Sequence, residues 1–493
     1  MQSARTIDDE IEIFVMIDNL KQKTKSGIYW QFFNQFTNYG LQFIVGIIIA
    51  RILTPEDYGI TALPSVFISV ACVFVDSGFT LALIRKEKLN DKDLYTSFTY
   101  GLTLGLFFYV ALYFASPLIA NFYSCNILTD LIRITALAFI IKPFLTPLIV
   151  LQKRNLDFKS ITKIAVVSKL ISVATGLYLV FNDFGLWTLI AMSLVEDLTK
   201  LVFSTIIVRW YPRIKWSKES FLYLWHFGNK ILISALLDTL YKNILPVFIG
   251  KYYSPYDLGV YNRAEGYSRL PSYQSMGIIE NVTYPVLCKV QDNNDSLARY
   301  YRRMIKTSVF VVFPIMLILS ALSRPLIIIM LTDKWEPCII LLQLLCFAFM
   351  WYPLNTLNLS LLQVKGRSDL YLRLEIVKKM IGLLLLVIAL PINLIAVVIS
   401  TILLNVLSVV INTHYTGHII GVPLKEQLRD ILPSLLMSVI MWGIVSLLIS
   451  IINNLYIQLA AGSIVGFVVY LGMALLLKRP ELDDVKYLIN RKK

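Results

Sequence analysis

The sequence predicts an all-α integral membrane protein with about fourteen transmembrane helices, arranged as two parallel six-helix repeats around a central cavity plus two extra C-terminal helices. Three observations support this fold class. Apolar residues make up 57% of the 493 residues and charged residues only 16%. The apolar residues form runs long enough to cross a bilayer, with the cations between them. A short turn motif near the start of the chain also returns in its second half.

The composition separates this chain from soluble proteins, in which about 25% of residues are charged. The net charge of +14 is carried in short blocks between apolar runs. Such blocks are typical of topology signals rather than of nucleic-acid binding, so no nucleic-acid partner is expected. Residues 1–27 are too rich in charge for a signal peptide, and we expect them to form a cytoplasmic N-terminal segment.

A helix needs about 20 apolar residues to cross a bilayer. Runs of this kind are expected at 28–52, 60–84, 95–117, 128–151, 160–181, 185–208, 225–249, 257–282, 304–331, 337–363, 370–390, 392–415, 431–451 and 455–477. We therefore predict an N-lobe over 28–215 (spans 1–6), a C-lobe over 216–420 (spans 7–12), spans 13 and 14 over 421–477, and a basic cytoplasmic tail over 478–493.

Cations alternate between the two sides of these spans and gather on the side that holds both chain ends. Cytoplasmic loops retain Lys and Arg, so both termini are predicted to be cytoplasmic. The outer loops are short, which argues against an external enzyme domain, and no Gly-rich phosphate loop occurs. The protein is accordingly not expected to be an enzyme.

The repeated turn runs over Thr54–Gly59 and again over Ser254–Gly259. Each copy follows an apolar run that ends in a cation, Arg51 or Lys251. An interval of six spans gives both halves the same orientation, related by an axis along the membrane normal. Two-fold repeats in membrane proteins are typical of alternating-access transporters, with the substrate cavity between the halves.

Polar stripes mark four spans, and these four are repeat mates. They comprise Gln31, Asn34, Gln35, Asn38 and Gln42 on span 1; Thr61, Ser65, Ser69 and Asp76 on span 2; Ser234, Asp238 and Lys242 on span 7; and Asn262, Glu265, Arg269, Tyr273 and Glu280, with Arg263 beside them, on span 8. Because polar groups are costly in lipid, the stripes predict a shared aqueous cavity. The alternative is that they only hold helices together, and Asp238 with Lys242 has the spacing of a purely structural pair.

The charges suggest two kinds of site. Fixed cations attract an anion such as a membrane-bound phosphate ester, so Lys242, Arg263 and Arg269 are the predicted substrate-binding residues. A second set supplies cavity polar groups or sites for a coupling H⁺ or Na⁺: Asp76, Asp238, Glu265, Glu280, Asn34, Gln35, Asn38 and Gln42. No catalytic residue, metal site or organic cofactor is expected.

An ordered set of short motifs carries a family resemblance. The motifs are Ala50–Gly59, Asp76–Phe79, Leu83–Arg85, Arg154–Phe158, Ile249–Lys251, Leu258–Tyr261 and Asp333–Trp335. With them the chain resembles the polysaccharide and O-antigen flippases of the multidrug/oligosaccharidyl-lipid/polysaccharide exporter superfamily. It is most similar to the fourteen-span branch that exports capsule, colanic-acid-like or teichuronic-acid-like chains.

The resemblance implies a multi-pass transporter of the bacterial cytoplasmic (inner) membrane. Its substrate would be an undecaprenyl-diphosphate-linked oligosaccharide, flipped to the periplasmic leaflet by alternating access. Membrane lipids, a polysaccharide polymerase and glycosyltransferases are the other implied partners. The alternative is a cation-coupled exporter of drugs or small metabolites with the same fold. One departure stands out, because relatives often carry an acid in an Asn-x-Asp setting on span 7, whereas here Lys242 precedes Asn243 and the nearest acid is Asp238.

Overall fold

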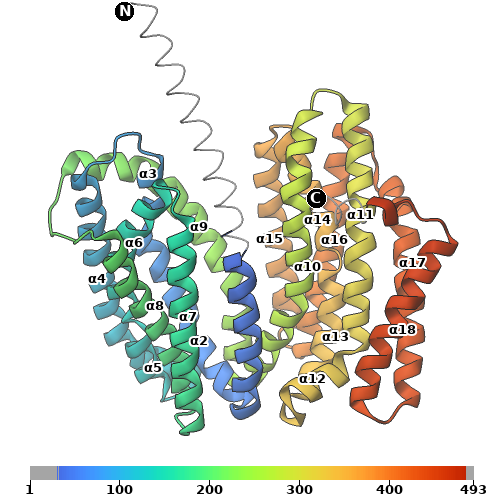
Figure 1. The fold of residues 1–493 in the computed structure, drawn as a ribbon, viewed down its shortest axis with the longest axis horizontal. Helices are drawn as coiled ribbons and strands as arrows, with labels where there is room; N and C mark the ends of the chain where they lie inside the picture. Colours follow the sequence, from blue (N-terminus) through green and yellow to red (C-terminus); the bar gives the residue numbers. More distant parts are fainter. Residues whose placement is uncertain (1–29, 31–32, 485–493) are drawn as a thin grey trace, which may run out of the picture. The chain divides into compact units, whose positions relative to one another are not determined.

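The computed structural model describes residue 30 and residues 33–484, which form α-helices, one short 3-10 helix and connecting turns, without a β-strand in this part of the chain (Figure 1). The chain divides into two compact units, Met1–Tyr256 and Asp257–Lys493. The predicted N-terminal segment 1–27 lies outside the described residues, as do Gln31 and residues 485–493 of the predicted tail 478–493.

The first unit contains a helix over 33–52 and eight further helices. These are α2 (Pro55–Asp76), α3 (Phe79–Arg85), α4 (Asp91–Tyr123), α5 (Leu128–Thr135), α6 (Ala138–Arg154), α7 (Phe158–Phe181), α8 (Trp187–Val208) and α9 (Lys218–Tyr252). Helix α7 packs against α8, α4 against α6, and α2 against α9. Helix α9 falls in the predicted segment 216–420, yet it packs within the first unit against α2 and α4.

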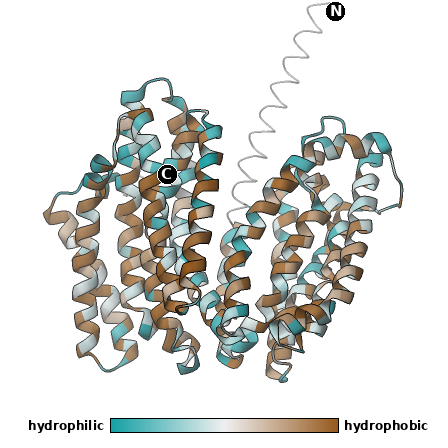
Figure 2. Ribbon diagram, turned by 180° about the vertical axis from the view of Figure 1, so that it is seen from behind, coloured by the Kyte–Doolittle hydropathy of each residue, from teal (hydrophilic) through white to brown (hydrophobic). Residues whose placement is uncertain are grey.

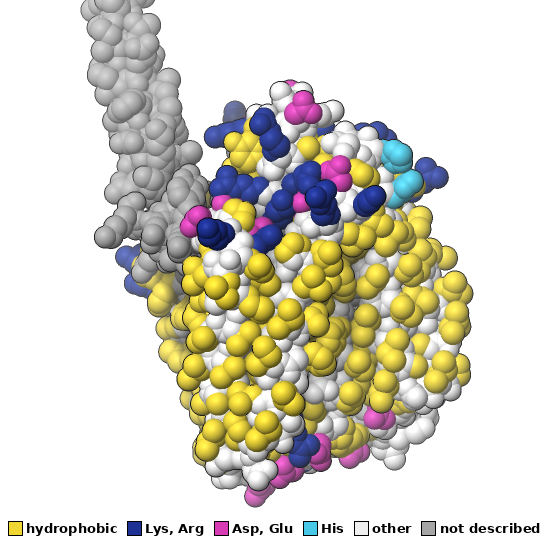
Figure 3. All heavy atoms as spheres, turned by 90° about the vertical axis from the view of Figure 1, so that its right-hand side faces the viewer, with side chains coloured by type: hydrophobic (Ala, Val, Ile, Leu, Met, Phe, Trp, Pro, Cys, Tyr) yellow, Lys and Arg dark blue, Asp and Glu magenta, His cyan; other side chains and the backbone are white. Residues whose placement is uncertain are grey.

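The second unit contains α10 (Pro255–Lys289), α11 (Asn294–Ala321), α12 (Ser323–Leu331), the 3-10 helix η1 (Asp333–Trp335), α13 (Cys338–Phe349), α14 (Tyr352–Val364), α15 (Ser368–Ala389), α16 (Leu394–Ile420), α17 (Leu424–Ile451) and α18 (Leu455–Leu476). Hydrophobic residues fill the middle of the helices, and hydrophilic ones gather near their ends (Figure 2). Figure 3 shows a broad hydrophobic band on one face, with most cations at one end and mainly acids at the other.

The structure confirms the all-α membrane fold class but not the count of fourteen spans. Each predicted run coincides with a helix or a pair of helices, and ten helical stretches are long and apolar enough to cross a membrane. The other four runs fall on the helix over 33–52, α8, α10 and α15. Helix α8 differs from the ten by its charge, since Glu196, Asp197 and Lys200 lie within five residues of one another in its middle. The chain is a multi-pass membrane protein.

The repeated turn has the same backbone form in both places: a helix ends, two residues intervene, and the next helix begins at Pro55 or Pro255. In the first copy Thr54 and Asp57 form a capping box, because the Thr54 side chain accepts from the Asp57 N–H while the Asp57 carboxylate accepts from the Thr54 N–H at 2.8 Å. This arrangement satisfies helix N–H groups that would otherwise lack partners. Pro at the first helical position adds a preset φ.

The second predicted span is broken between α2 and α3. Ser77 and Gly78 both have positive φ values, 46° and 71°, which end α2 directly after Asp76. At the break, Gly228 of α9 packs so closely that a Cβ atom placed on it would lie 2.5 Å from the Ser77 carbonyl oxygen. The missing side chains at Gly78 and Gly228 therefore allow α9 to touch the main chain of the break.

A buried polar network joins four helices of the second unit. The side-chain oxygen of Gln427 (α17) lies 3.5 Å from the Tyr301 hydroxyl (α11), 3.4 Å from Asn358 Nδ2 (α14) and 3.2 Å from Thr413 Oγ1 (α16). Thr416 also donates to Asn358. Because each member finds its partner on another helix, the network fixes how these four helices pack.

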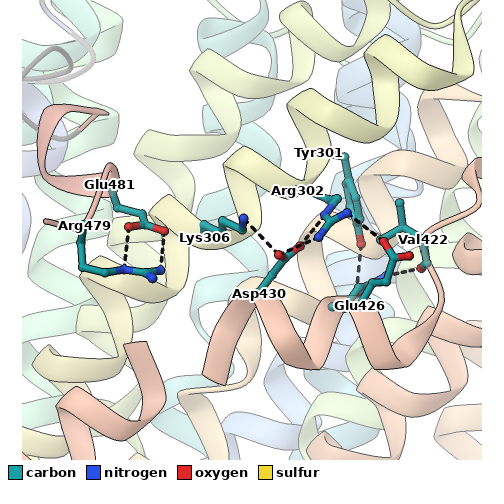
Figure 4. Close-up of polar contacts among 9 residues, drawn as sticks. Tyr301, Arg302, Lys306, Val422, Glu426, Asp430, Arg479 and Glu481 are labelled. Carbon is teal, nitrogen blue, oxygen red and sulfur yellow. Dashed lines mark hydrogen bonds and ion pairs between the residues drawn. The ribbon is translucent and has the colours of Figure 1, made fainter. Parts of the chain in front are cut away.

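Ion pairs extend this link between α11 and α17 (Figure 4). The Arg302 guanidinium donates from Nε and Nη2 to the Asp430 carboxylate at 2.7 and 2.9 Å, and Lys306 Nζ lies 3.1 Å from the same carboxylate. Arg302 also donates to Glu426 at 2.8 Å. The Asp430 side chain is only 4% exposed, so both cations are needed to offset its burial.

Candidate functional site

The polar stripe of α2 meets α9 inside the first unit. Asn243 Nδ2 of α9 donates to the Ser69 hydroxyl of α2 at 3.2 Å. Ser69 in turn donates to the Val66 carbonyl of its own helix at 2.9 Å, and Thr61 likewise donates back to Asp57 and Tyr58. These hydroxyl groups are therefore satisfied largely within α2, which fits a packing role better than a ligand-binding role.

Lys242 and Asp238 lie one turn apart on α9 and form an ion pair with an Nζ–Oδ2 distance of 2.7 Å. Their side chains are 63% and 48% exposed. An ion pair this exposed contributes little to stability, about 0–1 kcal/mol. The Lys242 ammonium is thus accessible, and Asp238 is the acid that would have to release it for an incoming anion.

Asp76 is held at the α2–α3 break. Its carboxylate accepts a hydrogen bond from Thr80, in the first turn of α3, and the next residue, Ser77, has its hydroxyl 3.1 Å from that of Tyr100 on α4. The sequence placed Asp76 on a continuous stripe of span 2. The structure instead puts it where the helix is interrupted, because two consecutive residues with positive φ end α2 there.

The helix over 33–52 carries the remaining predicted amides of the first unit. Asn34 and Asn38 hydrogen bond to each other, while Gln35 and Gln42 are exposed. Phe36 and Phe43, next to these glutamines in the chain, are also exposed. This helix thus has an outer surface of mixed character that is not covered within the first unit.

In the second unit, α10 assembles a cation, an acid and aromatic rings. Arg269 Nη1 lies 3.1 Å from Glu265 Oε1, and its Nη2 donates to the Tyr273 hydroxyl at 3.2 Å. The guanidinium carbon lies 4.7 Å from the centre of the Tyr273 ring, within the range of a cation–π interaction. Tyr273 stacks on Tyr352 of α14, with ring centres 3.9 Å apart. Glu280, about three turns beyond Arg269 on α10, accepts a hydrogen bond from the Ser360 hydroxyl of α14 at 2.8 Å.

Arg263 does not join this group. Its guanidinium lies 5.5 Å from the ring centre of the buried Trp335 and 5.9 Å from that of Tyr267. The structure therefore brings Glu265, Arg269 and Tyr273 together but gives Arg263 a different set of aromatic neighbours. Arg263 and Arg269 are six residues apart, which rotates them by about 120° around a helix.

Sequence reasoning missed Tyr352, which supplies the second ring of the stacked pair. It begins α14 after a break at Met350 and Trp351, between α13 and α14. The Tyr352-Pro353 pair, with proline near a helix start, was the available signal in the sequence.

The second unit also contains an apolar pocket of about 530 Å³. Residues of α11, α12, α17 and α18 line it, among them Phe310, Pro314, Met441 and Phe467, and Pro271 of α10 contributes to its wall. Among the described residues, no three His, Cys, Asp or Glu side chains gather in a group that could hold a metal ion. His414 and His418 are neighbours on α16, with ring centres 4.8 Å apart.

Known proteins share both the sequence pattern and the fold. Residues 48–340 match the family described as polysaccharide biosynthesis protein. The chain is 25% identical to the teichuronic acid biosynthesis protein TuaB of Bacillus subtilis (strain 168) over 71% of this chain and 73% of that protein. It is 24% identical to the lipopolysaccharide biosynthesis protein WzxC of Escherichia coli (strain K12) over 73% and 74%.

Among solved structures, the lipid II flippase MurJ in an inward closed conformation has the same fold, with a TM-score of 0.71. The match covers 92% of this chain and 99% of MurJ, and the two sequences are 16% identical. The family model spans well over half of the chain and includes the repeated turn, the α2–α3 break and α10. The protein belongs to the polysaccharide biosynthesis protein family.

Proposed function

We propose that this protein flips a lipid-linked oligosaccharide from the cytoplasmic to the periplasmic leaflet of a bacterial cytoplasmic membrane, by alternating access. Family membership and the named roles of TuaB and WzxC in glycan biosynthesis support the substrate class. The observation that carries the proposal is the cation Arg269 on α10. Its side chain is 37% exposed, pairs with the acid Glu265 and lies against the ring of Tyr273.

The head of such a substrate is a diphosphate with attached sugars. A guanidinium offers parallel N–H donors that fit phosphate oxygens, and Arg269 already directs Nη1 and Nη2 at two different oxygens. The exposed Lys242 ammonium provides a second cation of the same kind. Each of these cations, and Arg263 as a third, is a candidate contact for the diphosphate.

The tail of the substrate is a long apolar chain. The pocket among α11, α12, α17 and α18 is lined almost wholly by apolar side chains and is large enough for a segment of prenyl chain. Helices α17 and α18, which lie beyond the two six-helix repeats, form part of its wall. We assign to these two helices a part in holding the apolar chain of the substrate.

Orientation and energy coupling complete the proposal. The cation-rich loops belong on the cytoplasmic side, which makes both termini cytoplasmic. Asp76, Asp238 and Glu280 are the acids we assign to a coupling H⁺ or Na⁺, since Asp76 and Glu280 each accept a hydrogen bond from a hydroxyl group and the Asp238 side chain is about half exposed. No chemical step at a substrate bond is proposed. Glycosyltransferases would act before the flip, and a polymerase would act after it.

Flipping can be measured in proteoliposomes with a fluorescent undecaprenyl-diphosphate oligosaccharide whose outer-leaflet fraction is quenched. Loss of a charge-assisted hydrogen bond costs about 1.5–3 kcal/mol, so Arg269→Ala and Lys242→Ala should each slow flipping about tenfold or more. Arg324→Ala is the matched control, because Arg324 also lies 3.1 Å from a glutamate, Glu336, but is 60% exposed in the first turn of α12.

Normal flipping by Arg269→Ala, Lys242→Ala and Arg263→Ala together would refute the cationic site. A deletion strain with normal surface glycan but raised drug sensitivity would instead identify the protein as an exporter of small molecules.

A further inference from the structure

The connection between α8 and α9 is an unusual surface of the first unit. Residues 209–217 form no regular element, although they join two helices expected to span the membrane. Residues 209–218 contain four cations and no acid: Arg209, Arg213, Lys215 and Lys218. Aromatic and aliphatic residues stand between these cations, namely Trp210, Tyr211, Ile214 and Trp216.

This segment is fixed along the side of α4. The Thr99 hydroxyl donates to the Lys215 carbonyl at 3.0 Å and is 3.2 Å from the Lys215 N–H, and the Ser217 N–H donates to Thr96 Oγ1 at 3.1 Å. Trp210 stacks on Tyr95 of α4, with ring centres 5.6 Å apart. The segment is therefore a defined surface rather than a loose loop.

The side chains that this docking leaves outward are both apolar and cationic. Tyr211, Ile214 and Trp216 are 66%, 77% and 54% exposed. Arg213 and Lys218 are exposed as well. Bulky apolar groups interleaved with cations are typical of segments that lie in the plane of a membrane interface, where rings and alkyl stems enter the lipid and charges stay at the headgroups.

The length of α4 places the segment at the right depth. Its 33 residues span about 50 Å, whereas the hydrocarbon core is about 30 Å thick. About 10 Å at each end of the helix must then lie at headgroup level. Thr96 and Thr99 are five and eight residues from Asp91, about 8–12 Å into the helix. The segment docked on them thus meets the boundary between headgroups and hydrocarbon.

We propose that residues 209–218 form a binding site for anionic phospholipid, with Tyr211, Ile214 and Trp216 inserted at the interface and Arg213 and Lys218 on lipid phosphates. Charge complementarity selects this occupant, because four cations without an acid favour anionic over zwitterionic headgroups. The site is separate from Lys242, because Lys218 begins α9 and Lys242 follows 24 residues later on the same helix, about 36 Å along its axis.

Native mass spectrometry of the purified full chain can test this, with phosphatidylglycerol and phosphatidylcholine as probes. Arg213→Gln/Lys218→Gln should bind phosphatidylglycerol about 30-fold more weakly, at about 1 kcal/mol per cation, with phosphatidylcholine binding unchanged. Ile214→Ser/Trp216→Ser should weaken both lipids.

The matched control is Lys88→Gln/Lys92→Gln, which removes two exposed cations of the same unit, one on the α3–α4 connection and one in the first turn of α4, where acids also occur. This control variant should bind phosphatidylglycerol within about threefold of the wild type, because the two cations it removes are not interleaved with exposed bulky apolar side chains. Equal loss in this control would show a general charge effect and overturn the site. So would unchanged phosphatidylglycerol binding by Arg213→Gln/Lys218→Gln, or equally tight binding of soluble glycerol phosphate.

Discussion

The contact of α9 with the α2–α3 break gives a sharp prediction for Gly228→Ala. The new Cβ atom would lie 2.5 Å from the Ser77 carbonyl oxygen and 3.0 Å from Phe79 Cδ1. A main-chain oxygen cannot swing away as the end of a side chain can, so α9 or the break must move. Overpacking of this kind costs about 1–3 kcal/mol, and the better helix propensity of Ala returns at most about 1 kcal/mol. We expect a net destabilisation of about 1–2 kcal/mol.

The free energy of unfolding can be measured by SDS titration in mixed micelles, with Gly443→Ala as the control. Gly443 lies inside α17, and no atom stands within 4 Å of the place its Cβ would take. Its replacement should leave stability unchanged or raise it by up to about 1 kcal/mol. If Gly228→Ala is as stable as Gly443→Ala, the close approach at the break does not exist in the folded protein.

Three further substitutions probe the charged contacts. Arg302→Ala leaves the buried Asp430 carboxylate with Lys306 as its one remaining cation, so it should lower the free energy of unfolding by about 1–3 kcal/mol. A double-mutant cycle with Asp430→Asn that shows no coupling energy would contradict the ion pair. Lys242→Ala and Asp238→Ala should each change the free energy of unfolding by less than about 0.5 kcal/mol in the same titration, because their ion pair is exposed. A larger decrease would indicate that the pair has a structural role. The Arg154 guanidinium donates to four carbonyl oxygens at the end of α3 and on the α3–α4 connection, and one ammonium cannot replace all four bonds. Arg154→Lys should therefore make this connection more accessible to limited proteolysis. An unchanged cleavage rate would contradict the role of Arg154.

Local sequence rules predicted the elements and the contacts within a helix. The repeated turn follows an apolar run in both copies, as predicted, although the next helix begins at Pro55 and Pro255 rather than at residues 60 and 257. Asp238 and Lys242 pair as their spacing of four suggested. These predictions succeed because capping and helix periodicity depend on neighbours within one or two turns.

Contacts between distant segments could not be predicted in this way. Arg302 and Asp430 are 128 residues apart, and neither stands out in a chain whose cations mark topology. The stack of Tyr273 on Tyr352 depends on the register of α10 against α14, which no single stripe encodes. Arg263 was grouped with Arg269 by position in the chain, whereas helix rotation gives each its own aromatic neighbours.

The network around Gln427 has a consequence for the way the chain is assembled during synthesis. Tyr301, Asn358 and Thr413 emerge from the ribosome before Gln427, and all three contact its side-chain oxygen. Until α17 inserts, these polar groups lack that partner, although all three are fully buried in the finished fold, where an unpaired polar group is costly. A chain truncated before Leu424 should therefore be a substrate for membrane quality control rather than a smaller working transporter. The last two helices complete the insertion of those before them.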